Sequence, residues 1–313
     1  MSTRINPRLS ASWLALLSAA LLVGTMLSAA SAQQSFKSAD EAANALVSAA
    51  KSGDQKAVLS VLGKDAADLV SSGDPVEDQA TRQRYLAAYD EKHSIEMEGD
   101  NKAIVVVGKD DFPFPIPIMR KGDTWRFDTA AGREEILDRR IGRNELDAIQ
   151  SCLAYVDAQN DYADKDHGAG TGVYAQRIIS QPGKKDGLYW PTAQGEEESP
   201  LGELVASATK EGYKVGGGRA PFHGYYYKIL TKQGAKAQGG ELDYVVRSKM
   251  IGGFALVAYP AEYRNSGVMT FLVNHNGTIY QKDLGPNTAQ VAERMTAYEP
   301  DPSWQKVDTK DLQ

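Results

Sequence analysis

The chain has 313 residues, of which 42% are hydrophobic and 24% are charged, a composition typical of a globular protein that buries a sizeable core. Its formal net charge is -6, and its basic residues are interspersed with acids. This distribution argues against a nucleic-acid partner, because nucleic-acid binding normally requires a clustered basic face. Cys152 is the only cysteine, so no intramolecular disulfide can form, although an exported compartment would permit one.

The N-terminal segment has the order of residues that is typical of a secretory signal peptide. Arg4 and Arg8 precede an apolar run over residues 13–27, and small residues follow, ending in Ala30-Ser31-Ala32. A transmembrane anchor is the alternative, but the run is shorter than the roughly 20 residues that a bilayer-spanning helix needs. We therefore expect cleavage after residue 32, a mature protein that begins at Gln33, and a periplasmic or secreted location.

The first part of the mature chain is predicted to be helical and then to form a sheet. Ser38 and Glu41 make a capping box before apolar residues that recur at helical spacing up to Ser52. Further helical stretches are expected over residues 55–62, 66–70 and 81–92. Alternating and β-branched segments predict strands over residues 94–98, 103–107, 112–119 and 124–128. Helices followed by an antiparallel meander predict a small α+β domain over residues 33–140, with the helices on one face of the sheet.

Alternate prolines set apart the segment Phe112-Pro-Phe-Pro-Ile-Pro-Ile118. Proline removes a backbone donor, so such a strand is expected only at a sheet edge or as polyproline II. One interpretation is a rib that offers Phe112, Phe114, Ile116 and Ile118 to a partner. The favoured interpretation is an edge strand that is protected against unwanted pairing and turns these apolar side chains into the core.

A long helix is predicted over residues 133–161, because its apolar residues fit one helical face, with Gly142 as a potential break. Cys152 lies inside this helix beside Leu153, where a free cysteine usually acts as a small hydrophobic residue. The alternative, a catalytic thiol, would need a nearby histidine and an electropositive setting.

Oxygen donors are concentrated after this helix, at Asp161, Asp164 and Asp166, just before the glycine-rich segment Gly168-Ala-Gly-Thr-Gly172. Calcium prefers roughly six to eight oxygens from a flexible loop, so these acids could contribute to a calcium site, although their spacing does not match an EF-hand loop. A solvated helix end with a turn explains the same residues. We expect no other cofactor, and the glycines do not follow a predicted strand as a phosphate-binding loop would.

The rest of the chain is predicted to form loops and then an antiparallel sheet. Residues 180–218 are rich in turns, with a short helix expected over residues 200–209. Strands are expected over residues 225–231, 244–247, 253–259, 268–274 and 278–282. Asn276-Gly277 predicts a hairpin between the last two strands. An antiparallel sheet laid against the long helix is the simplest architecture for a second domain over residues 141–313.

The order of long helix, glycine-rich loops and terminal meander, closing on residues 271–280, resembles the globular part of type II secretion pseudopilins. The resemblance covers about residues 141–285 and implies a pilin-like fold without filament assembly, because charged residues around Glu134 to Glu145 stand where those proteins have an apolar stem. The N-terminal half similarly resembles a cystatin-like or nuclear-transport-factor-like fold.

Longer segments carry a more specific resemblance. They are Trp125-Arg-Phe-Asp-Thr-Ala-Ala-Gly-Arg-Glu-Glu135, Arg139-Arg-Ile-Gly-Arg-Asn-Glu-Leu146, Asp186-Gly-Leu-Tyr-Trp-Pro191, Pro221-Phe-His-Gly-Tyr-Tyr-Tyr227 and Ser266-Gly-Val-Met-Thr-Phe271. Through them the whole mature chain resembles a family of exported bacterial proteins, the domain of unknown function 2950. This resemblance implies export and leaves the function open.

An enzyme hypothesis rests on the histidines His93, His167, His223 and His275 and on nearby acids. His223 is the most interesting of them, because it lies where a loop enters a predicted strand, although a structural histidine beneath the neighbouring tyrosines is the simpler interpretation. The sequence has no G-x-S-x-G, H-E-x-x-H or C-x-x-C motif, and no residue is assigned a catalytic role.

The candidate binding residues are Arg139, Arg140, Asp186, Tyr189, Trp190 and His223. Aromatic rings beside charged groups suit sugars or peptidoglycan fragments, and they suit a domain interface equally well.

These observations predict a non-enzymatic envelope protein of two α+β domains, which binds or helps to assemble another envelope component, either a protein or a part of the cell wall. The alternative is a periplasmic hydrolase that acts on cell-wall or carbohydrate material. The two hypotheses differ in whether the candidate residues converge on one concave pocket, as an active site requires.

Overall fold

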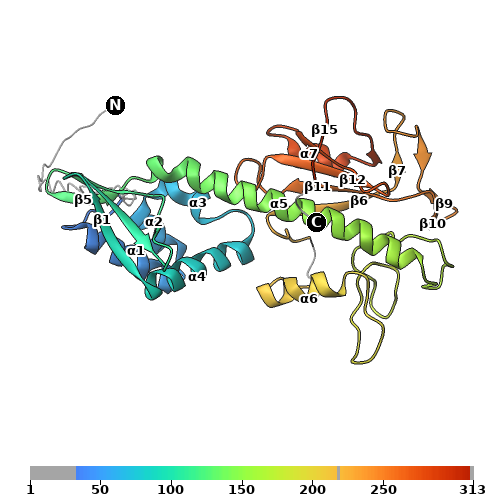
Figure 1. Cartoon of the computed structure of the whole chain (residues 1–313), viewed down its shortest axis with the longest axis horizontal. Helices are drawn as coiled ribbons and strands as arrows, with labels where there is room; N and C mark the ends of the chain where they lie inside the picture. Colours follow the sequence, from blue (N-terminus) through green and yellow to red (C-terminus); the bar gives the residue numbers. More distant parts are fainter. Residues whose placement is uncertain (1–32, 217–218, 311–313) are drawn as a thin grey trace, which may run out of the picture. The chain divides into compact units, whose positions relative to one another are not determined.

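The computed structural model describes residues 33–216 and 219–310, which form helices and mainly antiparallel sheets of the predicted α+β class (Figure 1). The predicted signal peptide lies outside the described residues. Within the described ranges, no helix combines the length and the apolar character that crossing a lipid bilayer demands.

Helices form the first part of the described chain, as the sequence predicts. They are α1 (Ala39–Ser52), α2 (Gln55–Leu62), the 3-10 turn η1 (Lys64–Ala66), α3 (Ala67–Val70) and α4 (Pro75–Glu91). The predicted cap of α1 is confirmed, because the Glu41 amide donates to the Ser38 hydroxyl at 3.1 Å. Helix α4 begins before its predicted start at residue 81, since Asp74 caps it and Pro75 occupies its first turn.

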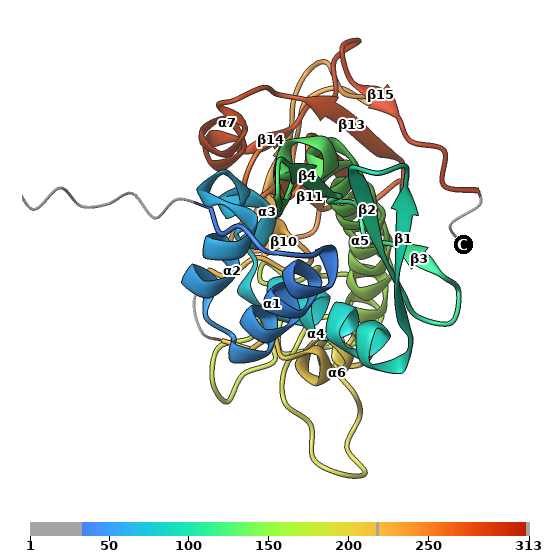
Figure 2. The ribbon, with the colours of Figure 1, turned by 90° about the vertical axis from the view of Figure 1, so that its left-hand side faces the viewer.

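A meander of short strands packs against these helices. The strands are β1 (His93–Glu98), β2 (Lys102–Val107), β3 (Phe112–Pro113), β4 (Ile118–Lys121) and β5 (Thr124–Phe127). Their order is β1-β2-β4-β5, with β3 also paired to β2, and all pairings are antiparallel. Figure 2 shows α1, α2 and α4 gathered on one side of β1 and β2. Apolar side chains of these helices join those of β2, β4 and β5 in one hydrophobic cluster, the N-terminal cluster.

The proline-rich segment is an interrupted strand. β3 and β4 pair with opposite ends of β2, and residues 114–117 lie between them. The prediction of an edge strand is confirmed for β3, which pairs with β2 alone among the described strands, and is wrong for β4, which begins at Ile118 and lies between β2 and β5. Ile116 and Ile118 are buried in the core, whereas Phe112 is 47% exposed. The prediction that the segment turns its apolar side chains inward is therefore confirmed for the isoleucines and wrong for Phe112.

One helix, α5 (Thr129–Ala163), runs for 35 residues through the position where the sequence predicts a division into two domains (Figure 1). The break considered at Gly142 is absent. A single glycine costs a helix only about 1 kcal/mol, which tertiary packing easily offsets. Ile136 packs on the N-terminal cluster, whereas Ile149 and Cys152 belong to a second cluster, the C-terminal cluster. Both clusters therefore share this helix.

The C-terminal part is built on a five-stranded antiparallel sheet in the order β15-β13-β12-β11-β6. Its strands are β6 (Tyr225–Leu230), β11 (Ala255–Pro260), β12 (Met269–Asn274), β13 (Ile279–Asp283) and β15 (Gln305–Lys306). Every residue of β11 is buried, so both faces of this strand are covered. Helix α5 packs on β11 and β12, and α7 (Thr288–Arg294) also packs on β11. The predicted sheet against the long helix is confirmed, and α7 is an element that the sequence pattern missed.

Shorter elements complete the C-terminal part. They are α6 (Gly202–Glu211), the ribbon of β9 (Val245–Val246) and β10 (Lys249–Met250), and the small sheet of β14 (Ala297–Tyr298), β7 (Lys232–Gln233) and β8 (Leu242–Asp243). The strand predicted over residues 244–247 is short, because the chain reverses at Arg247 and Ser248. Both residues have positive φ angles, of 49° and 67°, as a tight hairpin turn requires.

A buried carboxylate ties the two clusters together. Asp74 is 1% exposed, and one of its oxygens caps α4 by accepting from the Val76 and Glu77 amides at 3.1 and 3.3 Å. The other oxygen accepts from the Tyr213 hydroxyl at 2.9 Å and from the Gly224 amide at 3.0 Å. Asp74 therefore joins the start of α4 to the chain that leads into β6.

A buried guanidinium group makes a second connection from α5. Arg140 donates to the carbonyl oxygens of Asp68 and Leu69 and to the side chain of Asn265. Asn265 in turn donates to the Ser71 carbonyl at 2.9 Å. Burial lowers the pKa of Arg140, and nearby carboxylates act in the opposite direction. Because both terminal nitrogens of the guanidinium group donate, this buried charge holds the chain before α4 against the loop before β12.

Two glycines of α5 make a matched pair of test positions. A Cβ added at Gly132 would lie 2.5 Å from the Pro115 carbonyl oxygen, whereas a Cβ at Gly142 would meet nothing within 4 Å. We expect Gly132→Ala to lower the free energy of unfolding by about 1–3 kcal/mol, because the backbone of the proline segment must shift. Gly142→Ala should raise that free energy by roughly 0.5–1 kcal/mol, because alanine is the better helix former. Urea unfolding measures both changes, and effects of the same sign would contradict this packing.

Asp74→Ala should lower the free energy of unfolding far more than Asp54→Ala, which removes only the cap of α2. The loss of a cap costs about 1 kcal/mol. The Tyr213 hydroxyl and the Gly224 amide lose their acceptor and each add roughly 1–3 kcal/mol, so we expect a total loss of about 3–7 kcal/mol. Urea unfolding of both variants checks this difference. Equal losses would mean that the Asp74 carboxylate does not join the two clusters.

Candidate functional site

The six binding residues predicted from the sequence come from α5, from the loop over residues 186–190 and from the turn before β6. None of them lines either of the two pockets described below. Arg139 is exposed, pairs with Glu135, and holds its guanidinium 4.5 Å from the centre of the Phe112 ring. Arg140 is buried among backbone carbonyls, so these two neighbouring arginines have entirely different surroundings.

Asp186, Tyr189 and Trp190 lie in one loop that folds back on itself. Asp186 accepts from the Gln181 amide at 2.8 Å, and Tyr189 pairs through its backbone with the preceding segment of the loop. The Trp190 ring is buried and lies 5.2 Å from the ring of His167, measured between centres. These contacts give the three residues a role in holding the loop together.

His223 lies between two carboxylates, one on α5 and one on α6. Its Nδ1 is 3.5 Å from an Asp147 oxygen, and its Nε2 is 3.4 Å from a Glu211 oxygen. Its amide donates to the Tyr213 hydroxyl at 3.1 Å, and its φ of 49° is uncommon for a residue with a side chain. Burial raises the pKa of the Asp147 carboxyl. Because the carboxylates contact opposite ring nitrogens, the imidazole bridges the two helices and does not gather both acids around one metal ion.

Cys152 is fully buried in the C-terminal cluster. Burial raises the pKa of its thiol to about 12. The thiolate, which is the nucleophilic form, is therefore scarce at neutral pH. The prediction that this cysteine acts as a small hydrophobic residue is confirmed.

The acidic loop after α5 is organised by one of its aspartates. Asp166 accepts from the Gly168 and Gly170 amides at 2.8 and 2.7 Å, and these bonds lower the pKa of its carboxyl. Among the residues that the structure describes, no group of three or more histidine, cysteine, aspartate or glutamate side chains is placed to hold a metal ion. The contacts of Asp166 fit the interpretation of a helix end with a turn. A calcium site at Asp161, Asp164 and Asp166 stays a prediction.

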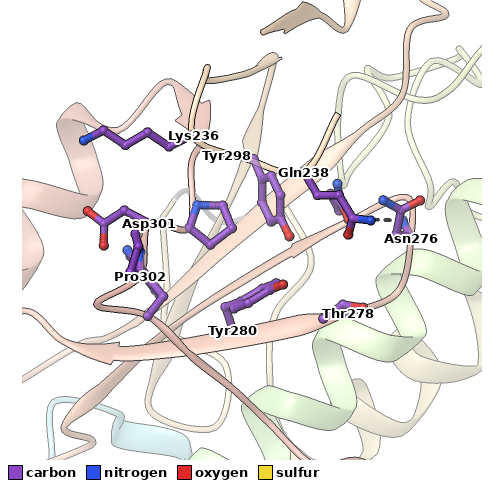
Figure 3. A pocket seen from close by; sticks show the side chains of 11 residues that line it. Lys236, Gln238, Asn276, Thr278, Tyr280, Tyr298, Asp301 and Pro302 are labelled. Carbon is purple, nitrogen blue, oxygen red and sulfur yellow. Dashed lines mark hydrogen bonds between the residues drawn. The ribbon is translucent and has the colours of Figure 1, made fainter. Parts of the chain in front are cut away.

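A pocket that the sequence did not predict opens beside the β12–β13 hairpin (Figure 3). Its volume of about 370 Å³ lies within the usual range for small-molecule sites, roughly 300–1,000 Å³. We call it the aromatic–amide pocket. Its lining residues are Lys236, Gln238, Asn274, Asn276, Thr278, Tyr280, Tyr298, Pro300, Asp301, Pro302 and Trp304.

Two tyrosines form the centre of the aromatic–amide pocket. Tyr280 of β13 and Tyr298 of β14 have ring centres 6.5 Å apart and planes inclined at 69°. Burial raises the pKa of Tyr298, so its hydroxyl stays neutral and can both donate and accept a hydrogen bond. Figure 3 shows other polar side chains at the two ends of these rings, with Gln238, Asn276 and Thr278 at one end and Lys236 and Asp301 at the other.

The polar residues of this pocket divide into structural and available groups. Asn274 is buried, and its side-chain oxygen accepts from the Asn276 amide at 3.1 Å, which fixes the hairpin turn. The side chains of Asn276 and Gln238 belong to exposed residues, so their carboxamides are available to a ligand. Asp301 accepts from the Ser303 amide at 2.9 Å, and its bonds to Ser303 lower the pKa of its carboxyl. Asp301 is therefore ionised at neutral pH.

No sequence pattern identifies this pocket, because its residues come from segments spread over residues 236–304. Five of the eleven lining residues are asparagine, threonine or tyrosine, and no motif distinguishes these from ordinary surface residues. The one available signal was the Asn276-Gly277 turn, which places Asn276 and Thr278 at the end of a hairpin. The position of β14 beside this hairpin was not predictable from that turn.

Comparison with known proteins identifies a family. The model of a family described as "Protein of unknown function (DUF2950)" matches residues 33–307, a range that includes both hydrophobic clusters and the aromatic–amide pocket. No curated protein and no solved structure matches the chain. The pilin-like and cystatin-like resemblances therefore stay predictions. Because the family model covers most of the sequence, the chain belongs to the DUF2950 family.

Proposed function

We propose that the mature chain is an exported, non-enzymatic envelope protein that binds a glycan of the cell wall in the aromatic–amide pocket. The observation that carries this proposal is the mixture of side chains in that pocket. Aromatic surface lies there beside amide and hydroxyl groups, supplied by Tyr280, Tyr298, Trp304, Gln238, Asn276 and Thr278.

This mixture fits the two kinds of surface on a sugar ring. The faces of the ring carry C–H groups, which pack on aromatic side chains that combine an apolar body with a polar end. Its edges carry hydroxyl groups, which exchange hydrogen bonds with carboxamides that both donate and accept. The ammonium group of Lys236, at one end of the pocket, can form an ion pair with a carboxylate of a cell-wall fragment that carries peptide.

The acidic residue that lines the pocket favours glycan binding over glycan hydrolysis. Most glycosidases use two carboxyl groups roughly 5–10 Å apart, and the lining residues include one acid, Asp301. The pKa of Asp301 is held below its usual value by Ser303, whereas a general acid needs a raised pKa. A periplasmic hydrolase is the alternative, and it would have to use other residues, such as His223.

Export is part of the proposal and rests on the N-terminal sequence. Residues 1–32 have the basic residues, the apolar run and the A-x-A ending of a signal peptide, and the family match begins directly after them. We expect the protein recovered from the cell envelope fraction to begin at Gln33, as measured by N-terminal sequencing. A protein that retains residues 1–32 would contradict cleavage and support an uncleaved anchor.

The binding test compares two aromatic variants of the purified protein. Trp304 lines the aromatic–amide pocket, whereas Phe112 is an exposed ring of the N-terminal sheet. We expect titration calorimetry to show that the protein binds a chitin tetrasaccharide. Trp304→Ala should raise the Kd at least tenfold, which corresponds to roughly 1.4 kcal/mol of binding free energy, whereas Phe112→Ala should leave the Kd unchanged. Asn276→Ala should also weaken binding. Because Asn276 is exposed, this variant tests the pocket without the loss of packing that Trp304→Ala causes.

In co-sedimentation with purified peptidoglycan sacculi, Trp304→Ala and Asn276→Ala should reduce the fraction of protein that is bound, whereas Phe112→Ala should leave it unchanged. Failure of the unsubstituted protein to bind either the tetrasaccharide or the sacculi would contradict the proposal. The protein would be a hydrolase if it released reducing ends from sacculi and if His223→Ala abolished this release without changing the free energy of unfolding. That result would contradict the non-enzymatic role.

A further inference from the structure

A second pocket, of about 570 Å³, lies beside α6 and has a mainly apolar wall. Helix α6 supplies Leu204, Val205 and Ala208, and the facing wall includes Tyr226 of β6 and Leu256 of β11. We call it the α6 pocket. Its volume lies in the middle of the usual range for ligand sites, roughly 300–1,000 Å³.

The apolar lining of the α6 pocket is only partly covered by the protein itself. Ile179 and Val215, which both line it, are 37% and 41% exposed, and Leu204 and Val205 are half-buried. Contiguous apolar surface that a protein leaves open to water usually marks a site where another apolar group binds. The pocket is concave, so its shape favours the insertion of a narrow apolar group.

The charged residues that line the α6 pocket are mainly basic. Lys214 is exposed, and Arg219 holds its guanidinium 4.4 Å from the centre of the Tyr226 ring while it pairs with Glu293 at 2.7 Å. The acid in the lining is Asp74, whose carboxylate already accepts hydrogen bonds from α4, Tyr213 and Gly224. An entering ligand therefore meets apolar walls together with an available positive charge at Lys214.

We propose that the α6 pocket binds the acyl chain of an anionic amphiphile, with the chain against α6 and the anionic head beside Lys214. This inference is independent of glycan binding, because the two pockets have no lining residue in common. A free fatty acid and a single-chain phospholipid present the same acyl chain and anionic head. The experiment therefore includes both.

The test measures the affinity of the purified protein for saturated carboxylates of increasing chain length, kept under their micelle-forming concentrations. Burial of a methylene group corresponds to about a fourfold gain in affinity, so Kd from titration calorimetry should fall by about that factor per carbon until the pocket is filled. A carboxylate should bind several-fold more tightly than the alcohol of equal length, and Lys214→Met should remove this difference. Tighter binding of a lysophospholipid than of the fatty acid would identify a single-chain phospholipid as the source of the acyl chain.

Matched variants locate the binding site. Val205→Asp introduces a charge into the apolar wall and should weaken binding more than tenfold, whereas Val291→Asp makes the same change at an exposed position of α7 and should leave Kd unchanged. Val205→Phe, which fills the pocket without adding a charge, is the second variant in case Val205→Asp fails to fold. Trp304→Ala should leave acyl binding unchanged, which separates this result from the test of glycan binding.

Several results would overturn the proposal. They are a Kd that does not depend on chain length, equal weakening by Val205→Asp and Val291→Asp, and undiminished binding in a folded Val205→Phe variant. A failure of the protein to bind any of the carboxylates or the lysophospholipid would overturn it as well.

Discussion

The rest of the structure depends on the burial of one helix, α5, in two hydrophobic clusters. Near its start, Gly132 allows the helix backbone to approach the carbonyl oxygen of Pro115. In its middle, Arg140 and Asn144 bind backbone carbonyls from both parts of the chain. Farther along, Cys152 packs under the C-terminal sheet. A continuous helix of this length is stiff, so these contacts place the two clusters together.

The position of both pockets follows from the same helix. α5 supports β11 and β12, and β12 continues into the hairpin that carries Asn276 and Thr278. The aromatic–amide pocket therefore forms where the supported sheet ends and β14 lies against it. The α6 pocket includes Ser151 and Tyr155 of α5, so it too is bounded by the shared helix. Tyr280 and Tyr298 in the first pocket lie on strands, and Leu204 and Val205 in the second lie on a helix, which favours fixed positions for these side chains.

Local signals in the sequence predicted the elements that local interactions stabilise. The cap at Ser38, the Asn276-Gly277 turn and the apolar face of α5 all predicted elements that the structure contains. The short elements α7 and β14 were missed, because packing on β11 and β12 stabilises them and no repeated pattern of their own identifies them. The early start of α4 was missed although Asp74-Pro75 is a recognisable helix start.

The candidate site was harder to predict than the fold. Arg139 and Arg140 are neighbours in sequence, yet successive residues of a helix point in different directions, so one is exposed and the other buried. The pocket residues Gln238, Tyr280 and Trp304 are distant in sequence and meet only through the order of strands in the folded protein. Residue type and spacing carry no record of that order, so the aromatic–amide pocket required the structure.

The most direct test of glycan binding is hydrogen exchange of the purified protein, measured by mass spectrometry with and without saturating chitin tetrasaccharide. We expect slower exchange in peptides that cover residues 274–282 and 298–306, with no change in peptides that cover α6. Protection confined to other regions, or no protection at any concentration of the tetrasaccharide, would contradict the assignment of the aromatic–amide pocket as the glycan site.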